Sequence, residues 1–455
     1  MPRYEPSRDM PFLSSLTPKG TTYTRALASS PWTVPSHVSL LTGLPAWSVH
    51  YHPGKLHIPT APSLASHWQE EGGEAVAFSG NGLVAPDYGT LTGYDKFNWG
   101  APNRTVAPRI WRWVSPFLGN APHAERRAIT PFFSTERGPG QLRRPAFLLG
   151  HRAIGTAVHA GARLLSAGVG LNWGIDRVLR QREANRPFHL FVNYMEAHEP
   201  YTLHPGFCLA RLPTNIFLPT MGLALRHSSY RDFPPASRMV IESYRRAMRA
   251  LDRRLVSLFA ILLRRGILED ALVVLASDHG QSLGERGFFG HGYVLDEPVI
   301  RVPVVAWSFH HGRAVPIKGG ETSDWFDHRH LFHAFRLWMN GQQGVALTEH
   351  LDESIRSLGP ALAYWEGPDV HDAEMPEKWE SAPSPNRALR AYSGRERLEI
   401  TQGIEEGVDG MRLSGPSNDS ALADKVRQIV GKGWTVPDSK PSTDLQYRLR
   451  SWGYL

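Results

Sequence analysis

Four short apolar runs, separated by longer segments, constrain the fold of this chain more than any other feature. They are EAVAFSG (residues 74–80), FHLFVNY (188–194), ALVVLAS (271–277) and VPVVAW (302–307). Compact, mostly apolar runs of this length are typical of strands that are covered on both faces. A helical pattern of apolar residues fills 239–265 and stops at Gly266. This alternation predicts an α/β domain with parallel strands and crossover helices.

Polar residues directly follow three of these predicted strands. Asn81 follows the first, Glu196 and His198 follow the second, and Asp278 and His279 follow the third. In open α/β sheets, ligands bind at the edge where the strands end. The sequence therefore predicts one functional site built from these separate loops.

The strongest local signal for chemistry is the Asp278-His279 pair. A carboxylate and an imidazole side by side suit a hard or borderline divalent cation. His291 follows twelve residues later, in a glycine-rich loop that can fold back over the same place. An isolated Asp-His pair is more often a simple turn at a strand end, but the sequence LGERGFFGHG behind it favours a site.

The segment SSPWTVPSHVSLLTGL (29–44) predicts the start of a helix. Pro35 fits a first helical turn, and Gly43 is a natural stop. Thr33 is then expected just outside the positive end of the helix, where free backbone N–H groups favour a bound anion. His37 leans over the same end. The plainer interpretation is a capped helix with a chance histidine.

Together these segments resemble the sulfatase family within the alkaline phosphatase superfamily. Residues 33–43 resemble the family's nucleophile signature, and SDHGQSLGERGFFGHG (277–292) followed by DEPVIRVPVVAW (296–307) resembles its second metal segment. FVNYMEAHEPY (191–201) resembles its substrate-histidine loop, and PSLASHWQEEGGEAVAFSGN (62–81) with GYDKF (93–97) resembles the segment after the nucleophile. The resemblance spans roughly residues 11–336. It implies an α/β, sulfatase-like mixed sheet flanked by helices.

The resemblance also implies roles for individual residues. Thr33 would be the nucleophile, and Asp278 and His279 would bind one divalent cation, with Ca²⁺ preferred over Mn²⁺ or Zn²⁺. His291 would hold the transferred group or protonate the leaving oxygen, and His198 would contact the substrate. A cation and a helix N-terminus would lower the pKa of the hydroxyl and stabilise the transferred oxyanion.

Two residues depart from the family pattern. Position 33 is threonine, whereas the family converts a cysteine or serine there to formylglycine, so no formylglycine is expected. A threonine would act as a plain alkoxide, which favours phosphoryl over sulfuryl chemistry. His37 replaces an arginine and lacks its fixed charge and bidentate geometry, so it is either catalytic or a capping histidine. Ser36 and Asn81 are further candidate substrate contacts.

The N-terminal region is a third departure. The family normally opens with an apolar strand that ends in an aspartate-rich metal motif, but this chain begins MPRYEPSRDMPFLSSL, with Asp9 as its only aspartate in that region. Half of the metal site and a central strand are therefore expected to be absent from the sequence. Either the true protein is longer or it is non-catalytic, and the intact downstream residues favour the first alternative.

Composition and charge narrow the remaining choices. Cys208 is the only cysteine among 455 residues, so no internal disulfide can form. No secretion signal is recognisable, which makes a cytoplasmic location the expectation. The apolar segment 154–175 contains His159 and Arg163, so a helix is favoured over a membrane span.

Positive charge is concentrated in one segment. The net charge is +7, and residues 101–186 hold 14 arginines, no lysine and four acids. One interpretation is a basic wall that attracts anionic substrates or an anionic membrane surface. The other is an inserted segment with solvated arginine side chains, and this interpretation is preferred. Nucleic acid is not expected, because no recognition motif accompanies the charge.

The predicted organisation is a catalytic domain over 1–340, with an arginine-rich insertion at 101–186. A smaller C-terminal unit over 341–455 would follow a proline-rich connection at about 366–385. The expected function is metal-dependent hydrolysis or transfer of sulfate or phosphate esters of small molecules or glycans. The alternatives are a catalytically inactive anion-binding protein and a phosphoglycerol- or phosphoethanolamine-type transferase. The sequence leaves the oligomeric state open.

Overall fold

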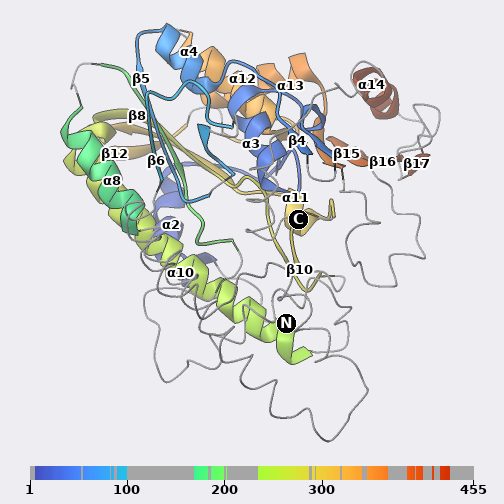
Figure 1. Ribbon diagram of the computed structural model, residues 1–455, viewed down its shortest axis with the longest axis horizontal. Coiled ribbons are helices and arrows are strands. Elements are labelled where there is room, and N and C mark those ends of the chain that lie inside the picture. Colours follow the sequence, from blue (N-terminus) through green and yellow to red (C-terminus); the bar gives the residue numbers. More distant parts are fainter. Residues whose placement is uncertain are drawn as a thin grey trace, which may run out of the picture.

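A computed structural model of the chain describes most of residues 6–430. The described ranges are 6–99, 169–201, 234–366, 387–402, 412–414 and 421–430, apart from short gaps at 53–54, 82, 87–89, 183–185, 199–200, 286–288, 293, 318–319, 341–345 and 395. Strands lie between helices in a mixed α/β arrangement (Figure 1). The expected fold class is therefore confirmed.

The first part of the β layer is a three-stranded parallel sheet in the order β6-β5-β7. Its strands are β6 (Lys96–Trp99), β5 (Glu74–Ser79) and β7 (Phe188–Asn193). The central strand β5 is buried along its whole length, while every residue of the edge strand β7 is partly exposed. Parallel pairing was the expectation for β5 and β7, and it is confirmed.

The second part of the β layer is antiparallel. Strand β11 (Val304–His310) pairs along one edge with β8 (Asp270–Ala276), and along the other with β1 (Thr21–Tyr23) and β12 (Arg313–Pro316). The expectation of parallel strands was wrong for β8 and β11. The chain between them holds only the short β9, β10 and α11, and antiparallel strands need no crossover helix.

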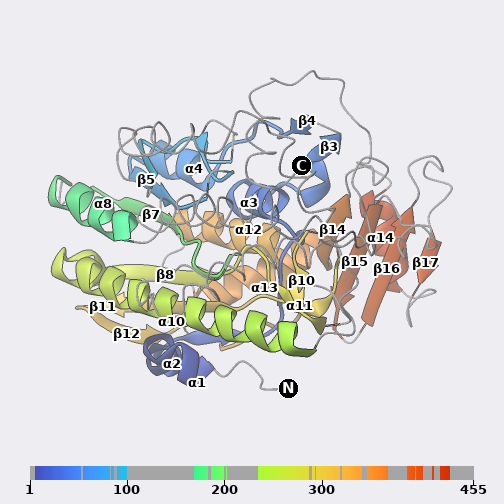
Figure 2. The same ribbon diagram turned by 60° about the horizontal axis from the view of Figure 1, so that its bottom comes forward.

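Helices cover both faces of the β layer (Figure 2). On one side lie α8 (Val169–Arg180), α10 (Pro234–Arg264) and α2 (Pro11–Leu16). On the other lie α3 (Thr33–Thr42), α12 (His328–Met339) and α13 (Leu347–Leu358). The predicted helix at 239–265 is confirmed by α10, and the positive φ of 69° at Gly266 marks its end.

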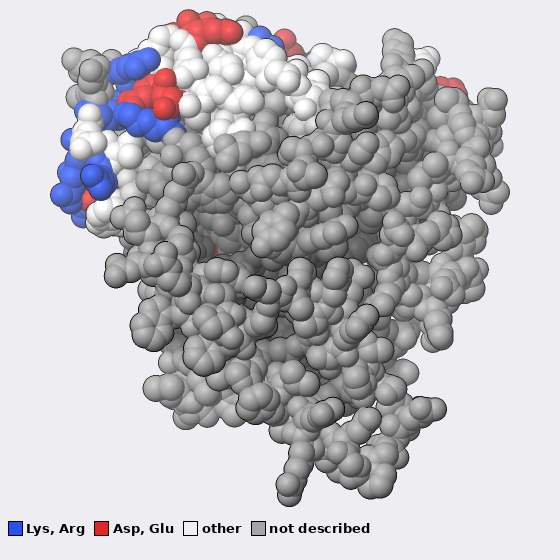
Figure 3. All heavy atoms as spheres, in the orientation of Figure 1, with Lys and Arg blue, Asp and Glu red and all other residues white. Residues whose placement is uncertain are grey.

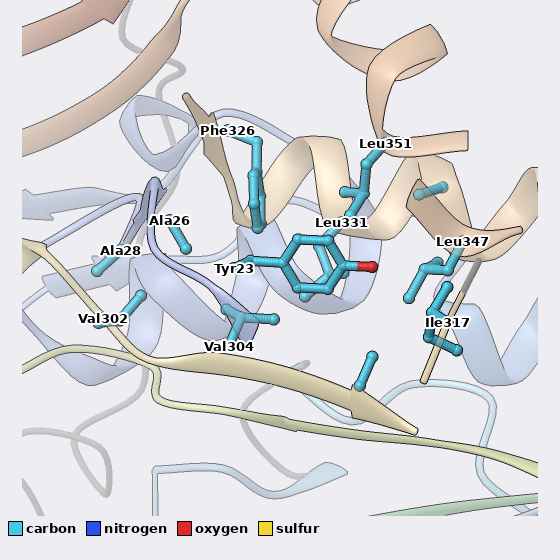
Figure 4. Close-up of a cluster of buried hydrophobic side chains, with 12 residues drawn as sticks. Tyr23, Ala26, Ala28, Val302, Val304, Ile317, Phe326, Leu331, Leu347 and Leu351 are labelled. Atoms are coloured by element: carbon cyan, nitrogen blue, oxygen red, sulfur yellow. The ribbon is translucent and has the colours of Figure 1, made fainter. Parts of the chain in front are cut away.

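The core beneath α12 and α13 ties the short strand β1 to the rest of the fold (Figure 4). The ring of Tyr23 packs edge-on against Phe326, and its hydroxyl hydrogen-bonds Thr348 on α13 at 2.9 Å. The other labelled members of this cluster are Ala26, Ala28, Val302, Val304, Ile317, Leu331, Leu347 and Leu351.

A separate antiparallel sheet in the order β14-β15-β16-β17 packs against Trp47, together with α14. These elements are β14 (Ala361–Glu366), β15 (Arg387–Ser393), β16 (Glu396–Gln402), β17 (Arg412–Ser414) and α14 (Ala421–Val430). The proposed domain boundary near residue 340 stays a prediction, and most of the proline-rich connection lies outside the described residues.

The remaining elements are short. They are α1 (Pro6–Asp9), β2 (Ala26–Leu27), β3 (His50–His52), β4 (Lys55–His57), α4 (Leu64–Glu70), β9 (Ser282–Leu283), β10 (Phe289–Gly290), α11 (Glu297–Ile300) and β13 (Phe326–Asp327), with single 3-10 turns at Thr17–Lys19, Ala46–Ser48 and Ile267–Glu269.

Most of the arginine-rich segment, residues 101–168, lies outside the described residues. Its last part forms α8, which packs into the core through Leu171 and Ile175. Basic side chains gather on the side of the molecule where α8 and the end of α10 lie (Figure 3). Asp176 pairs with Arg180 and Arg264 there, so part of this charge is neutralised. Within the described ranges, no helix is long and apolar enough to cross a membrane.

Candidate active site

Helix α3 brings Thr33 into the interior of the protein. Thr33 is the first residue of this helix and is fully buried, and Trp32 before it is extended. The expectation that Thr33 lies just outside the helix was wrong by one residue. The last extended residue before the helix is Trp32, and the helical backbone begins at Thr33. The predicted stop at Gly43 is confirmed by its φ of 72°. The Thr33 side chain therefore stands at the positive end of the helix.

The loop after β8 places an imidazole against the Thr33 hydroxyl. The Nδ1–H of His279 donates to the carbonyl oxygen of Gly280 at 2.9 Å, which leaves the lone pair of Nε2 on the other side of the ring. That Nε2 lies 3.4 Å from Thr33 Oγ1 and 3.5 Å from Asp278 Oδ2. The two segments predicted to share a site are therefore in contact.

Gly280 is required for this turn. A Cβ at this position would lie 2.1 Å from the carbonyl oxygen of Pro298. The Gly280 N–H also donates to the Val299 carbonyl oxygen at 2.6 Å, which holds the loop against α11. Any larger residue would move the adjacent His279.

His37 links α3 to both strand ends. Its Nδ1–H donates to the Thr33 carbonyl oxygen at 2.9 Å and lies 3.5 Å from Asp278 Oδ2. Its Nε2 accepts a hydrogen bond from Asn193 Nδ2 at 2.9 Å. Burial lowers the pKa of His37, although the Asp278 carboxylate opposes that shift. His37 is thus a neutral, fully hydrogen-bonded ring rather than a fixed positive charge.

Asp278 is the most solvent-accessible member of this group, with 24% of its side chain exposed. Burial by itself raises the pKa of Asp278. The positive charge that His279 and His37 carry when protonated, together with a hydrogen bond from the His279 backbone, outweighs this effect and holds the pKa below its ordinary value. The carboxylate is therefore ionised at neutral pH.

His291 and His198 complete a row of imidazoles beside Thr33. The His291 ring stacks on His279 with centroids 4.3 Å apart, and His198 meets His291 edge-on at 4.8 Å. The Nδ1–H of His291 donates to Gln281 Oε1 at 3.3 Å. The structure thus brings together His37, His198, His279 and His291 with Thr33.

Ser36 and Asn81 make local structural contacts. The Ser36 hydroxyl donates to the Ser30 carbonyl oxygen at 2.8 Å and accepts from the Ser30 N–H. Asn81 Oδ1 accepts from the Leu83 N–H at 2.9 Å and closes a turn. Neither side chain contacts Thr33 or Asp278 in the hydrogen bonds of the described residues, and their role as substrate contacts stays a prediction.

Two residues near the site were not singled out from the sequence. His328 begins α12; its Nε2–H donates to the Ser277 carbonyl oxygen at 3.1 Å, and its Nδ1 accepts from the Ser29 N–H. It therefore holds the loops before α3 and after β8 together. Asn193 ends β7, and its Oδ1 is buried without a hydrogen-bond partner in the described part of the chain. In the sequence, only the Asp-His-Arg-His cluster at 327–330 could have pointed to His328.

The donors for a metal ion are incomplete in the described residues. Asp278 Oδ2 and His279 Nε2 face one another and could ligate one cation, but no group of three His, Cys, Asp or Glu residues in these ranges could hold a metal ion. Zinc usually takes four ligands and calcium six to eight. Two protein donors therefore do not make a metal site by themselves.

Part of the chain is similar to a known family. Residues 171–367, which include the His279 loop and the predicted substrate-histidine loop, match the sulfatase family model. This match covers less than half of the chain, so the sulfatase family is what this part of the chain resembles. It is 24% identical over 311 residues to choline-sulfatase of Rhizobium meliloti (strain 1021); the match covers 61% of this chain and 54% of that protein. The chain therefore spans about half the length of this curated relative.

Two solved structures resemble the fold. Phosphonate monoester hydrolase from Silicibacter pomeroyi has a TM-score of 0.54 at 16% identity, over 93% of this chain and 90% of that one. The phosphonate monoester hydrolase of Agrobacterium radiobacter has a TM-score of 0.51 at 16% identity, over 93% of this chain and 89% of that one. The chain thus shares the fold of these two proteins.

Proposed function

We propose that this protein is a member of the sulfatase family that hydrolyses or transfers sulfate or phosphate esters, with Thr33 as the nucleophile. The observation that carries the proposal is the contact between Thr33 Oγ1 and the lone pair of His279 Nε2, at the N-terminus of α3. A hydroxyl beside an acceptor imidazole is the arrangement that nucleophilic catalysis needs. Separations near 3.4 Å are common before a substrate tightens such a contact.

The chain's own groups suffice for a balanced first step. His279 Nε2 takes the hydroxyl proton while Thr33 Oγ1 forms a bond to the sulfur or phosphorus atom. The bond to the leaving oxygen breaks, and the neighbouring His291 or His198 protonates that oxygen. Backbone N–H groups in the first turn of α3 stabilise charge on the transferred group. The Thr33 ester is then cleaved by water, which completes hydrolysis, or by the hydroxyl of an acceptor, which completes transfer.

Members of this family generally depend on a divalent cation. In this chain Asp278 and His279 Nε2 are the donors that would hold it, and when bound it would act as a Lewis acid on the oxyanion. His279 has a single free lone pair, so it would then serve as a ligand and not as the base of the step above. Because the described residues supply only these two donors, no step above is routed through the cation. The incomplete donor set also favours the second candidate, a silent protein that binds anions in the same place.

His37 stands where an arginine would bring a fixed positive charge to the site. Its ring orients Asp278 and the Thr33 carbonyl but brings no permanent positive charge to the anion. The substrates would be small-molecule or glycan esters, and the relatives add choline sulfate and a phosphonate monoester as compounds to try.

The test is an esterase assay on the purified chain and two variants at position 33. p-Nitrophenyl sulfate, p-nitrophenyl phosphate, a phosphonate monoester and choline sulfate are offered with and without Ca²⁺, Mn²⁺ or Zn²⁺. Thr33→Val keeps the shape but removes the hydroxyl, so activity should fall at least ~100-fold, while Thr33→Ser should retain a measurable rate. Full activity in Thr33→Val would exclude this nucleophile. No turnover by the wild type, with anion binding that persists in Asp278→Ala, would favour the silent protein.

A further inference from the structure

Gly292, the residue after His291, is held by hydrogen bonds at both of its backbone polar groups. Its N–H donates to the Pro31 carbonyl oxygen at 3.0 Å, and its carbonyl oxygen accepts from the Trp365 Nε1–H at 2.7 Å. Pro31 lies two residues before Thr33, whereas Trp365 lies in β14 of the C-terminal sheet β14-β15-β16-β17. One residue therefore joins the loop of His291 to the segment before Thr33 and to the C-terminal sheet.

These two hydrogen bonds fix the backbone at its most adaptable point. Gly292 has a φ of 93°, in the left-handed region that residues with a Cβ rarely adopt. Because a glycine has more backbone conformations open to it than any other residue, the glycine by itself does not select this one. The hydrogen bonds to Pro31 and from Trp365 select it, and they thereby fix the direction in which the chain leaves His291.

The contacts of the His291 ring with the other described residues of the site are looser. Its Nδ1–H donates to Gln281 Oε1 at 3.3 Å, which is longer than the usual range for an N–H···O bond. The ring stacks on His279 with centroids 4.3 Å apart and meets His198 edge-on at 4.8 Å. Stacked rings tolerate lateral offsets, so these contacts alone do not fix the place of the imidazole. The backbone hydrogen bonds at Gly292 supply the tighter restraint.

The C-terminal sheet also holds the chain beyond Gly292. Arg390 of β15 donates through Nη1 to the Leu295 carbonyl oxygen. The Leu295 side chain packs in the same apolar cluster as Trp365. The segment after His291 is thus attached to this sheet by two hydrogen bonds and by apolar packing.

The neighbouring residue of β14 holds the other half of the site. The Tyr364 N–H donates to the Ser29 carbonyl oxygen at 2.8 Å, and Ser29 lies four residues before Thr33. Tyr364 and Trp365 are adjacent in one strand. Two consecutive residues therefore set the spacing between the segment that carries Thr33 and the segment that carries His291.

We propose that Trp365 is a positioning residue, whose indole N–H fixes Gly292 and thereby keeps His291 where its imidazole can protonate the leaving oxygen. This role rests on the proposed function, and it assigns the proton to His291 rather than to His198. The His291 ring stacks directly on His279, the base for Thr33, whereas His198 lies one ring further away. The proton moves from His291 to the leaving oxygen as the bond from sulfur or phosphorus to that oxygen breaks. Trp365 exchanges no proton and acts only through Gly292.

Trp365→Phe tests this role and has a matched control in the same apolar cluster. The phenyl ring keeps most of the apolar surface but removes the N–H. Trp325→Phe makes the same change at a residue that is 7% exposed, against 5% for Trp365. The Trp325 Nε1–H donates to the Gly394 carbonyl oxygen at 3.2 Å, in the turn between β15 and β16. Both variants should unfold at similar urea concentrations, so a general loss of stability affects them equally.

The kinetic measurement compares the phenyl and p-nitrophenyl forms of the ester that the wild type turns over. The p-nitrophenolate ion leaves without a proton, whereas phenolate gains much more from one, so the loss of a positioned acid affects the phenyl ester. Trp365→Phe should lower kcat at least ~10-fold for the phenyl ester and less than ~3-fold for the p-nitrophenyl ester. Trp325→Phe should change the ratio of the two rates less than ~2-fold. An equal loss with both esters, or the same change of ratio in Trp325→Phe, overturns the proposal.

A second measurement does not need turnover. Chemical shifts of the histidine Cε1–H groups are recorded with carbon-13-labelled histidine at about pH 8, where histidines are neutral, and the His291 signal is assigned from its loss in His291→Gln. This signal should shift or broaden in Trp365→Phe and keep its wild-type position in Trp325→Phe. An unmoved His291 signal in Trp365→Phe overturns the proposal whether or not the chain is active. A moved signal in a chain that turns over no ester would reject the proposed function but leave the positioning of His291 by Trp365 in place.

Discussion

The ring of His328 makes the stability of the protein depend on pH. This residue is 2% exposed, and it joins the Ser29 N–H to the Ser277 carbonyl oxygen. Burial is the main cause that lowers its pKa from 6.5 to about 4, against the opposing charge of Asp327. Protonation would also place an N–H on Nδ1, which now accepts a hydrogen bond. The folded state therefore keeps this ring neutral.

The sign and size of the effect follow from linkage. Between pH 6.5 and 4 the unfolded chain binds a proton at this histidine and the folded chain does not, so stability falls as the pH falls. The drop of the pKa to about 4, at about 1.4 kcal/mol per pH unit, amounts to roughly 3 kcal/mol over that window. Above pH 7 the contribution is constant.

Urea unfolding of the wild type and of His328→Gln, at several pH values from 7.5 to 4.5, measures this term. Glutamine can still donate to the Ser277 carbonyl oxygen but does not titrate. The stability difference between the two proteins should shrink steadily as the pH falls below 6.5, because only the wild type loses the histidine contribution. A difference that stays constant across the range would refute the reasoning, since other histidines titrate equally in both proteins.

Two further changes test the packing of the core and the site loop. Leu171→Ala on α8 should lower the free energy of unfolding by about 2–5 kcal/mol, as at other buried leucines. Trp173 is 66% exposed, so Trp173→Ala should lower it by less than about 1 kcal/mol. Equal losses in urea unfolding would contradict the placement of α8. Gly280→Ala should cost more than about 2 kcal/mol and disturb His279, because its Cβ meets the Pro298 carbonyl oxygen. Gly72→Ala is the control, because a Cβ at position 72 has no atom within 4 Å. It should cost only the strain of a positive φ, about 1–2 kcal/mol. A Gly280→Ala protein as stable as this control would disprove the close contact at Gly280.

The sequence located the main elements because their signals are local. An apolar run identifies β5 within one residue of its observed end, and apolar spacing with Gly266 places the end of α10 within one residue. The pairs Asp278-His279 and Thr33-His37 stand out in the sequence because each carries reactive groups at a predicted strand or helix end. Each of these inferences needs only neighbouring residues.

Other features depend on contacts between residues far apart in the chain. No local pattern states that β8 runs antiparallel to β11, because the direction of a strand follows from the path of the connecting chain. The closure of the site by Asn193 and His328 brings together β7, α3 and α12, which are separated by more than a hundred residues.

The sequence by itself thus determined which residues of this protein could carry out chemistry and which segments form strands and helices. The tertiary structure alone decided that His279 presents its lone pair to Thr33, and that Trp365 of the C-terminal sheet holds Gly292 beside His291. The physical reason is that residue spacing encodes local periodicity and burial, whereas a hydrogen-bond partner is chosen by packing in three dimensions.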